Sequence, residues 1–254
     1  MKKYAFMFMG ILMIVLSFSG CSSKVTSIEE LKQRGSIVMT TNAELEPFEY
    51  RDGNEIVGID IDISKKIAES LGVELVVNDV SFDALIFELK GNKCDFVAAG
   101  MSYNVDRARN VSFSVPYFNA SQDIVVRNDS DIKSAEDIKN KTIGVQLGTT
   151  SDSYCTENLK SSSVVRYNKS VDAVSDLINK RIDVVVVDDF LANKLIDKNP
   201  DLIKKLDERL TTEEYMLCVN KQNTELLNFI NSEIENLKQT GELDSIIKKY
   251  RKDE

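Results

Sequence analysis

The chain has 254 residues, a formal net charge of −9 at pH 7 and no histidine. The missing histidine excludes Ser-His-Asp and Cys-His catalysis and histidine-ligated zinc or iron. The acidic balance argues against binding to nucleic acid and against an electrostatic hold on anionic lipid. A site for an anion in such a chain therefore needs a local, well-placed cation.

Residues 1–20 have the pattern of a secretory signal peptide. Two early lysines precede an uncharged, mostly apolar run from Tyr4 to Phe18, which is too short for a stable membrane span. A Ser-Gly pair then precedes Cys21, and this boundary resembles a bacterial lipobox. We expect Cys21 to carry the lipid and residues 21–35 to form the anchor and linker. The alternative is plain cleavage, with Cys21 as a bystander.

Short apolar runs then alternate with helical patterns, which predicts an α/β unit. A helix spans about residues 60–71 and ends at Gly72, and a second, shorter helix ends at Gly91. The predicted strands lie at residues 37–39, 75–77 and 96–98. This βαβαβ order favours a mostly parallel sheet flanked by helices.

The same rhythm restarts in the second half and predicts a second α/β unit. Its strands lie at 142–145, 164–167 and 184–187, with helices from near 151 and over 171–178. The last strand is fully apolar and β-branched, which indicates burial on both faces. Two more helices are predicted in the tail, up to Tyr250. Cys94 and Cys218 have the surroundings of buried core thiols, whereas a disulfide through Cys155 stays open.

Two further apolar runs, 124–126 and 215–219, are predicted to cross between the units. The resulting fold is a two-lobed α/β protein with two hinge crossings. Lobe I is discontinuous, with residues 36–120 plus 216–254, and lobe II comprises 121–215. The crevice between the lobes lies at the carboxyl ends of the strands, where open α/β sheets bind ligands.

The segment after the strand at 96–98 carries the first candidate binding residues. Gly100 allows close backbone approach, Ser102 supplies a hydroxyl, and Arg107 supplies a forked cation. The pattern resembles G-(M/I)-(S/T)-x-T-x-x-R of the polar amino acid family of solute-binding proteins (family 3). The resemblance implies that Arg107 grips a ligand α-carboxylate and that Gly100 and Ser102 contact the carboxylate and the ammonium. It also implies the type II periplasmic-binding-protein fold.

Two segments of the second unit match the same family. The resemblance implies that Thr149 and Thr150, in a Gly-rich turn that opens a helix, help to hold the carboxylate, and that Gln146 reaches toward the ligand side chain. Ordinary N-capping by Thr150 or Ser151 is the structural alternative. Asp188, at the end of the buried strand, matches the position that pairs with the ligand ammonium, and the adjacent Asp189 is then a helix cap.

The first-unit wall of the cleft comes from two segments. Leu45 stands where the family usually has a stacking aromatic residue, and Phe82 keeps the second aromatic. Asn42 stands where relatives that bind basic ligands can carry an acid. These residues favour a neutral or polar amino acid slightly over a basic one or cystine, although Glu46 is a possible charge for lysine or arginine.

The resemblance implies the extracytoplasmic substrate-binding component of an amino acid ABC importer. The expected partners are a free L-amino acid, a permease and, through the lipid, the outer face of the bacterial cell membrane; the expected state is a monomer. No catalytic residue, metal site, cofactor or nucleic-acid partner is expected. Two alternatives stay open. A lyase-like enzyme on this scaffold would depend on Glu46 as its acid or base. A sensor would need a separate partner, because no signalling segment follows Glu254.

Overall fold

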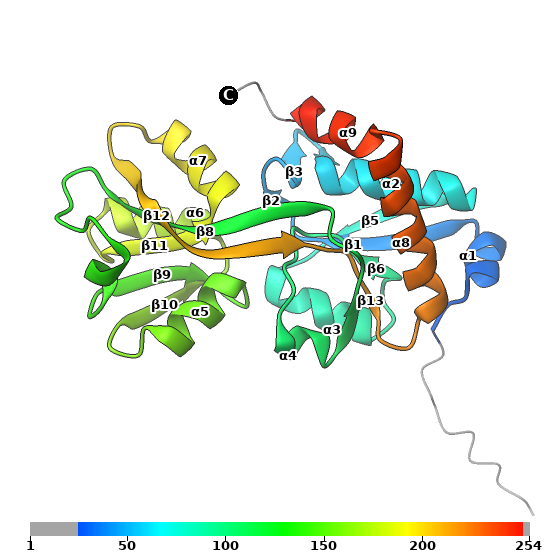
Figure 1. Ribbon diagram of the computed structural model, residues 1–254, viewed down its shortest axis with the longest axis horizontal. Helices are drawn as coiled ribbons and strands as arrows, with labels where there is room; N and C mark the ends of the chain where they lie inside the picture. The colour runs from blue at the N-terminus through cyan, green and yellow to red at the C-terminus, as the bar shows by residue number, and fades with distance from the viewer. Residues whose placement is uncertain (1–24, 251–254) are drawn as a thin grey trace, which may run out of the picture.

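A computed structural model describes residues 25–250 of the chain, so the predicted signal peptide and Cys21 lie outside the described residues. Two lobes, each built on a five-stranded sheet, lie side by side and are joined by two long strands (Figure 1). Within the described residues, no helix is both long and apolar enough to cross a membrane. The predicted two-lobed α/β architecture is confirmed.

The first lobe has a mixed sheet in which three neighbouring strands are parallel. In spatial order these strands are β5 (Glu74–Asp79), β1 (Ser36–Thr41), β6 (Phe96–Val97), β13 (Cys218–Asn220) and β7 (Val111–Phe113). The strand β13 runs antiparallel to both of its neighbours. A small antiparallel sheet of β2 (Glu44–Leu45), β3 (Glu49–Asp52) and β4 (Glu55–Val57) extends the lobe.

Helices cover both faces of this sheet. They are α1 (Ile28–Arg34), α2 (Ile59–Leu71), α3 (Leu85–Lys90), α4 (Val105–Ala108), α8 (Thr224–Gln239) and α9 (Glu242–Tyr250), with a 3₁₀ turn η1 (Phe82–Ala84). Apolar residues of α2, α8 and α9 share one core cluster with β1 and β13, so the tail of the chain packs back on the first lobe (Figure 1). Hydrophobic burial along these amphipathic helices is the main stabilising term.

Backbone geometry fixes where α2 begins and ends. Gly58 precedes it with φ +138°, and a Cβ there would lie 2.1 Å from the carbonyl oxygen of Phe48. The helix ends at Gly72 in the left-handed conformation, as its glycine predicts. The start is therefore a close approach that only glycine allows.

The second lobe repeats the arrangement with its own core. Its strands in order are β10 (Ser163–Tyr167), β9 (Thr142–Gln146), β11 (Val184–Asp188), β8 (Phe118–Arg127) and β12 (Ile203–Tyr215). Its helices are η2 (Ala135–Ile138), α5 (Thr150–Asn158), α6 (Ser170–Ile178) and α7 (Asp189–Lys198). Alternate valines of β11 belong to two different core clusters, one on each face of the sheet, and all are at most 4 % exposed. The prediction that this strand is buried on both faces is confirmed.

The two long strands β8 and β12 pair antiparallel to each other and pass between the lobes. The first crossing includes the predicted run 124–126. The prediction that 215–219 forms the second crossing strand is wrong: β12 ends at Tyr215, and Cys218 already begins β13 in the first lobe. The strand β12 lies at the edge of its sheet and pairs only with β8, and most of its side chains are polar. It therefore lacks the apolar run by which the other strands were predicted. The lobe boundaries near residues 120 and 216 stay a prediction.

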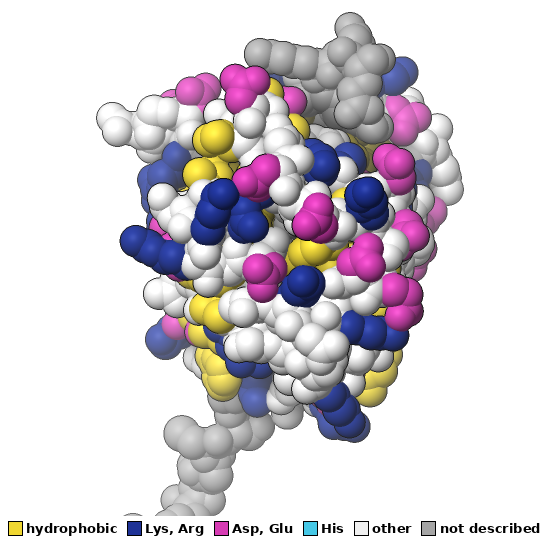
Figure 2. Space-filling view, turned by 90° about the vertical axis from the view of Figure 1, so that its left-hand side faces the viewer, with side chains coloured by type: hydrophobic (Ala, Val, Ile, Leu, Met, Phe, Trp, Pro, Cys, Tyr) yellow, Lys and Arg dark blue, Asp and Glu magenta, His cyan; other side chains and the backbone are white. Residues whose placement is uncertain are grey.

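The far end of the second lobe shows basic and acidic side chains intermixed, with hydrophobic side chains in small groups (Figure 2). Scattered surface hydrophobics of this kind are normal for a globular protein. This face therefore carries no patch of a single charge sign.

Candidate functional site

A cavity of about 410 Å³, with the solvent at its mouth included, lies between the two lobes. All ten residues singled out in the sequence line it: Asn42, Leu45, Phe82, Gly100, Ser102, Arg107, Gln146, Thr149, Thr150 and Asp188. Four lining residues were not predicted: Glu44, Glu49, Ala99 and Leu191. The structure thus brings the candidates together, whereas their contacts to a ligand stay predictions.

Arg107 lies on the short helix α4 and is only 8 % exposed. Asn104, which replaces the usual threonine of the family pattern, caps this helix, since its Oδ1 accepts from the backbone N–H of Arg107 at 3.2 Å. The guanidinium donates to the carbonyl oxygens of Ser102 and Gly148, each at 2.8 Å. Burial lowers the pKa of Arg107. Two of its five N–H groups are thus used for positioning, and the others can bind an anion.

Phe82, in the 3₁₀ turn η1, lies against this cation. The Cζ atom of Arg107 is 5.3 Å from the centre of the Phe82 ring, a cation–π distance. The aromatic ring predicted as a wall for the ligand therefore also supports the arginine that faces it.

The turn between β9 and α5 presents a helix N-terminus to the cavity. Thr149 is the N-cap, because its hydroxyl oxygen accepts from the backbone N–H of Asp152 at 3.3 Å. The expectation that Thr150 or Ser151 caps this helix is therefore wrong by one or two residues. The Thr149 hydroxyl donates to the carbonyl of Gln146 at 2.7 Å, so its proton is already used within the turn.

Asp188 stands at the junction of β11 and α7, where the strand ends inside the cleft. Its Oδ1 accepts from Gln122 Nε2 and from the Tyr215 hydroxyl, both at 2.8 Å. Burial, with the charge of Glu213 as the next cause, raises the pKa of Asp188 to about 7. A cation placed beside this carboxyl would favour its ionised form.

The interpretation of Asp189 as the cap of α7 is wrong. Asp188 occupies the N-cap position, although its side chain makes no capping hydrogen bond, and Asp189 is the first helical residue. The Asp189 carboxylate accepts from the backbone N–H of Phe190 at 3.0 Å. Because the strand leads directly into the helix, the N-cap position falls one residue earlier than expected, on Asp188.

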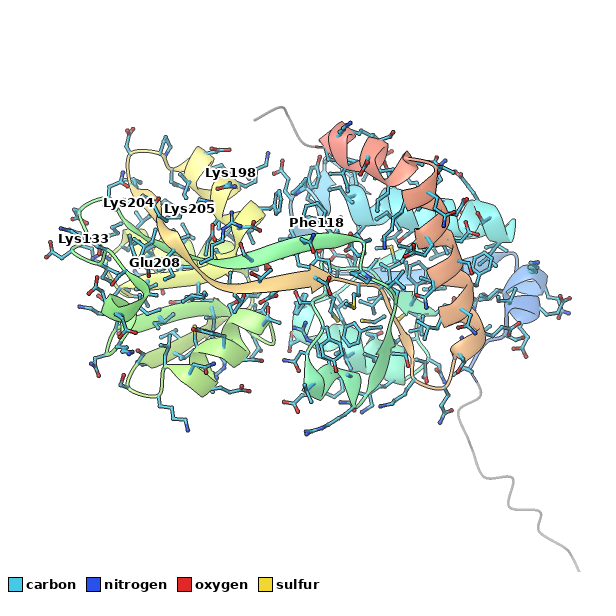
Figure 3. All side chains as sticks on the ribbon, viewed as in Figure 1. Phe118, Lys133, Lys198, Lys204, Lys205 and Glu208 are labelled. Carbon is cyan, nitrogen blue, oxygen red and sulfur yellow. The ribbon has the colours of Figure 1, made fainter. Side chains whose placement is uncertain are left out.

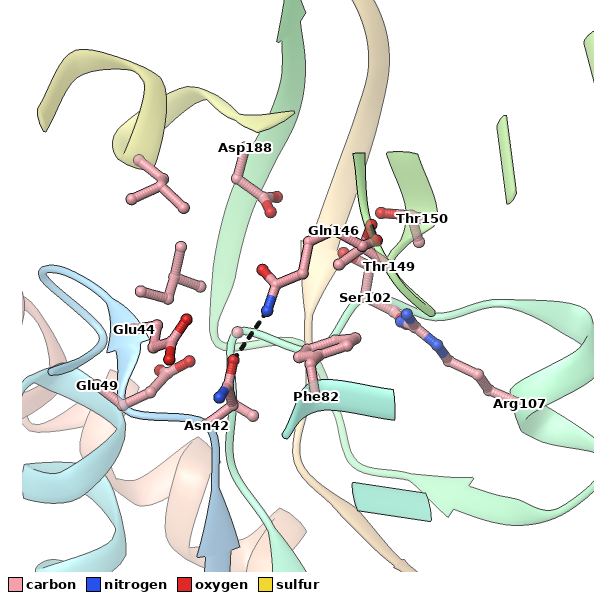
Figure 4. Close-up of a pocket in the computed structure, with 14 residues that line it drawn as sticks. Asn42, Glu44, Glu49, Phe82, Ser102, Arg107, Gln146, Thr149, Thr150 and Asp188 are labelled. Carbon is pink, nitrogen blue, oxygen red and sulfur yellow. Dashed lines mark hydrogen bonds between the residues drawn. The ribbon is translucent and has the colours of Figure 1, made fainter. Parts of the chain in front are cut away.

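The opposite end of the cavity holds amide and acidic side chains. Figure 4 shows Arg107 at one end of the lining residues and Asn42, Glu44 and Glu49 at the other. The Asn42 Oδ1 accepts from Gln146 Nε2 of the second lobe at 3.1 Å (Figure 4). Neither acid could be assigned to the cavity from the sequence. Glu44 and Glu49 lie in a hairpin of short strands, in which the alternation of apolar and polar residues is too short to show which side chains face the core.

Glu49 is 1 % exposed and hydrogen-bonded to Asp60. Burial and then the charge of Asp60 raise the pKa of Glu49 well above its usual value. Asp60 also accepts from the Tyr117 hydroxyl at 2.6 Å and from the backbone N–H of Gly100 at 2.9 Å. The Oε2 of Glu49 makes no hydrogen bond to the described residues.

Gly100 is required by its surroundings. Its φ is +50°, and a Cβ at this position would lie 2.3 Å from Cδ2 of Leu45. The neighbour that excludes a Cβ at Gly100 is the side chain of Leu45, the N–H of Gly100 is bound to Asp60, and the contact of Gly100 with a ligand stays a prediction.

Glu46, the acid considered for a basic ligand or for catalysis, does not line this cavity. It faces Lys194 at 3.3 Å and Lys198 at 3.9 Å across an adjacent groove. Figure 3 shows Lys198 on α7, where the second lobe faces the first. The hypothesis that Glu46 supplies a charge inside the cleft is therefore wrong.

Polar contacts join the lobes across and around the cavity. Besides the pairs of Glu46 with Lys194 and Lys198, they include Arg107 Nη2 to Gly148 O at 2.8 Å, Gln146 Nε2 to Asn42 Oδ1 at 3.1 Å and Lys169 Nζ to Glu44 Oε1 at 2.7 Å. Each of these contacts must break when the lobes separate, so the described structure is a closed arrangement.

Cys94, Cys155 and Cys218 are all buried and free, so the open question about Cys155 is answered within the described residues. Burial raises the pKa of Cys94 to about 11 and that of Cys155 to about 12. Such thiols stay protonated and unreactive. Across residues 25–250, no group of three or more His, Cys, Asp or Glu side chains is placed to hold a metal ion.

Glu213 of β12, which was given no site role in the sequence analysis, contacts two residues that line the cavity. Its Oε2 accepts from the hydroxyls of Ser102 at 2.5 Å and Thr150 at 2.8 Å. The Thr211 hydroxyl donates to the other oxygen at 2.8 Å. The segment 212–215 resembles the family's return-crossing segment, but that resemblance implied no site role for Glu213, which lies on a mostly polar strand.

Comparisons with known proteins agree with the two-lobed α/β fold. The arginine-binding extracellular protein ArtP of Bacillus subtilis (strain 168) is 31 % identical over 243 residues, which cover 93 % of each chain. The crystal structure of the P235GK mutant of ArgBP from T. maritima superposes with a TM-score of 0.83 at 42 % identity, covering 88 % of this chain and 98 % of that one. The ancestral amino acid-binding protein AncCDT-1, a precursor of cyclohexadienyl dehydratase, superposes with a TM-score of 0.81 at 32 % identity, covering 88 % and 98 %.

The family model of the bacterial extracellular solute-binding proteins, family 3, matches residues 37–253. This range contains both lobes and every residue that lines the cavity. The family expected from the sequence motifs is thus confirmed, and the chain belongs to the bacterial extracellular solute-binding proteins, family 3.

Proposed function

We propose that the protein captures a free L-amino acid between its lobes and delivers it to an ABC importer at the outer face of the bacterial cell membrane. Arg107 takes the α-carboxylate, and Asp188 takes the α-ammonium. The observation that carries this proposal is the placement of one buried guanidinium and one half-buried carboxyl on opposite lobes around a single cavity. Charged groups removed from water need such complementary partners.

We further propose that the preferred ligand is arginine, which departs from the slight expectation of a neutral or polar ligand. Arg107 is the one Lys or Arg side chain among the described residues that line the cavity. After Asp188 has bound the ammonium, Glu44 and Glu49 remain as acceptors at the far end. Glu49 contributes an oxygen without a partner, and an unsatisfied buried acceptor is costly until a donor reaches it. A guanidinium supplies five donors, the relative ArtP is named an arginine-binding protein, and a mutant of ArgBP has been solved in an arginine-bound form.

Closure of the lobes completes the site in this proposal. The ligand first meets Arg107 and Ser102 of the first lobe, and the second lobe then adds Asp188 and the turn at Thr149. The permease recognises the closed form, because only closure fixes the surfaces of both lobes in one relative position. We also propose that the protein acts as a monomer and that Cys21 carries its lipid anchor.

A thermal-shift screen of the chain from residue 22 onward tests the ligand assignment. Arginine, lysine, ornithine, citrulline, norleucine and cystine should be compared with the common amino acids at equal concentration. A ligand present at 100 times its Kd stabilises the folded state by about 2.7 kcal/mol, so the best ligand gives the largest rise in Tm. Arginine should rank first and citrulline well below it. A larger rise with citrulline or another neutral amino acid would contradict the arginine proposal.

The enzyme alternative keeps one observation in its favour, since carboxyl groups line the cavity and AncCDT-1 is named as a precursor of a dehydratase. We propose binding without turnover, because Glu46, the acid that the alternative depended on, faces lysines in another groove. Arginine incubated for a day with stoichiometric protein should be recovered unchanged by mass spectrometry. Conversion products that require the protein would support the enzyme instead.

A further inference from the structure

The hydroxyl groups of Ser102 and Thr150 come from different lobes and line the same cavity. Both donate to one oxygen atom, Oε2 of Glu213, at 2.5 Å and 2.8 Å. A hydroxyl has one proton and two lone pairs. With their protons directed to Glu213, these two groups can only accept hydrogen bonds from a ligand.

Hydrogen bonds from Gln122 and Thr211 favour the same direction of the hydroxyl protons. The Gln122 amide donates both to Thr150 Oγ1 at 3.3 Å and to Asp188 Oδ1 at 2.8 Å, which links the threonine hydroxyl to the carboxyl that faces the ammonium. Glu213 is held in turn by the Thr211 hydroxyl at 2.8 Å. A ligand carboxylate carries only lone pairs, so it gains nothing from two oxygens that are themselves acceptors, whereas an ammonium has three protons to donate.

We infer that Glu213 is a positioning residue that turns the Ser102 and Thr150 hydroxyls into acceptors for the α-ammonium of the bound amino acid. The inference rests on the proposed function and refines it. The ammonium is held by Asp188 and two oriented hydroxyls, and the carboxylate is left to Arg107 and backbone N–H groups. Glu213 itself makes no ligand contact in this arrangement.

The structure offers a matched control for this role. Glu214 is the next residue of β12, and because side chains alternate along a strand it points to the opposite face, where it is exposed. Glu213→Ala and Glu214→Ala therefore remove the same charge from adjacent positions, and only the first removes the acceptor of the two hydroxyls.

Comparing two ligands shows whether a substitution affects the ammonium site alone or the whole binding site. One is L-arginine, and the other is 5-guanidinopentanoate, which is arginine without its α-amino group. Glu213→Ala should weaken arginine binding about 10-fold, the typical effect of lost charge-assisted hydrogen bonds, while the Kd of 5-guanidinopentanoate changes less than about twofold. Glu214→Ala should leave both Kd values unchanged. Equal weakening of both ligands by Glu213→Ala would overturn the inference, and so would no weakening of either.

A double-mutant cycle tests whether Glu213 acts through the hydroxyls. In a Ser102→Ala, Thr150→Val background, Glu213→Ala should cause no further loss of arginine affinity, whereas a full additional loss would refute the inference. If Glu213→Ala does not fold, Glu213→Gln supports the same comparison, because its NH2 group in the place of Oε2 donates to both hydroxyls and reverses them, while Thr211 still donates to the amide oxygen. Absence of arginine binding by the unaltered protein would defeat the proposed function instead, so the two failures are distinguishable.

Discussion

Replacing Arg107 by alanine is the most direct perturbation of the site. Its guanidinium is almost fully buried, is fixed by two carbonyl oxygens at 2.8 Å, and faces a cavity lined otherwise by acids and neutral groups. In the proposed complex it pairs with the ligand carboxylate. Removing one partner of a buried ion pair costs about 3–5 kcal/mol, because the remaining charge is left without compensation. We therefore expect the Kd for arginine to rise about 150- to 5,000-fold in Arg107→Ala.

Isothermal titration calorimetry at matched protein concentrations measures this change, and circular dichroism checks the fold. Arg109→Ala is the control, since Arg109 is 73 % exposed and pairs only with the equally exposed Asp106. The two variants lose the same charge two positions apart. Arg107→Lys should fall between them, because an ammonium cannot reproduce the forked geometry. Binding by a folded Arg107→Ala variant within tenfold of the unaltered protein would refute the assignment.

Three further predictions concern charge and backbone. Burial raises the pKa of Asp188 to about 7, and the ligand ammonium needs the ionised carboxylate. Arginine affinity measured by calorimetry should therefore be about tenfold weaker at pH 6 than at pH 8. In Asp188→Asn the affinity should be nearly independent of pH. Glu44→Gln should narrow the preference for arginine over norleucine in competition assays, and an unchanged ratio would exclude a role for Glu44. Gly100→Ala should lower Tm more than Gly35→Ala, since both have positive φ but a Cβ at Gly100 alone meets a neighbouring side chain.

Much of the fold could be predicted because the α/β pattern is local. The helix over 60–71 and the strand at 184–187 both follow from apolar spacing and from terminal glycines or turns. The second crossing strand could not be found this way. Residues 203–215 are largely charged, and they form a strand only because β8 offers a long backbone ladder on which they pair. Tertiary pairing overrides a weak local preference there.

The sequence predicted which residues line the candidate site better than it predicted their hydrogen bonds and roles. The family motifs gave Arg107 and Asp188. Arg107 lies on α4, in the segment after β6, and Asp188 is the last residue of β11, so both lie near strand ends that face the cleft. Assigning Glu46 to the cleft failed for a geometric reason. Only the folded hairpin decides which acid faces inward, and it places Glu44 and Glu49 on the cavity and Glu46 against Lys194.

A sequence motif shows which side chains a site contains. It does not show whether a hydroxyl donates or accepts a hydrogen bond, because that depends on the direction of the hydroxyl proton. Ser102 and Thr150 would serve a carboxylate equally well if their protons were free. Glu213, 111 residues from Ser102 and 63 from Thr150, takes both protons and thereby assigns both oxygens to the positive end of the ligand. Recognition of the ligand in this fold therefore depends on a crossing strand that joins the lobes as well as on the residues that line them.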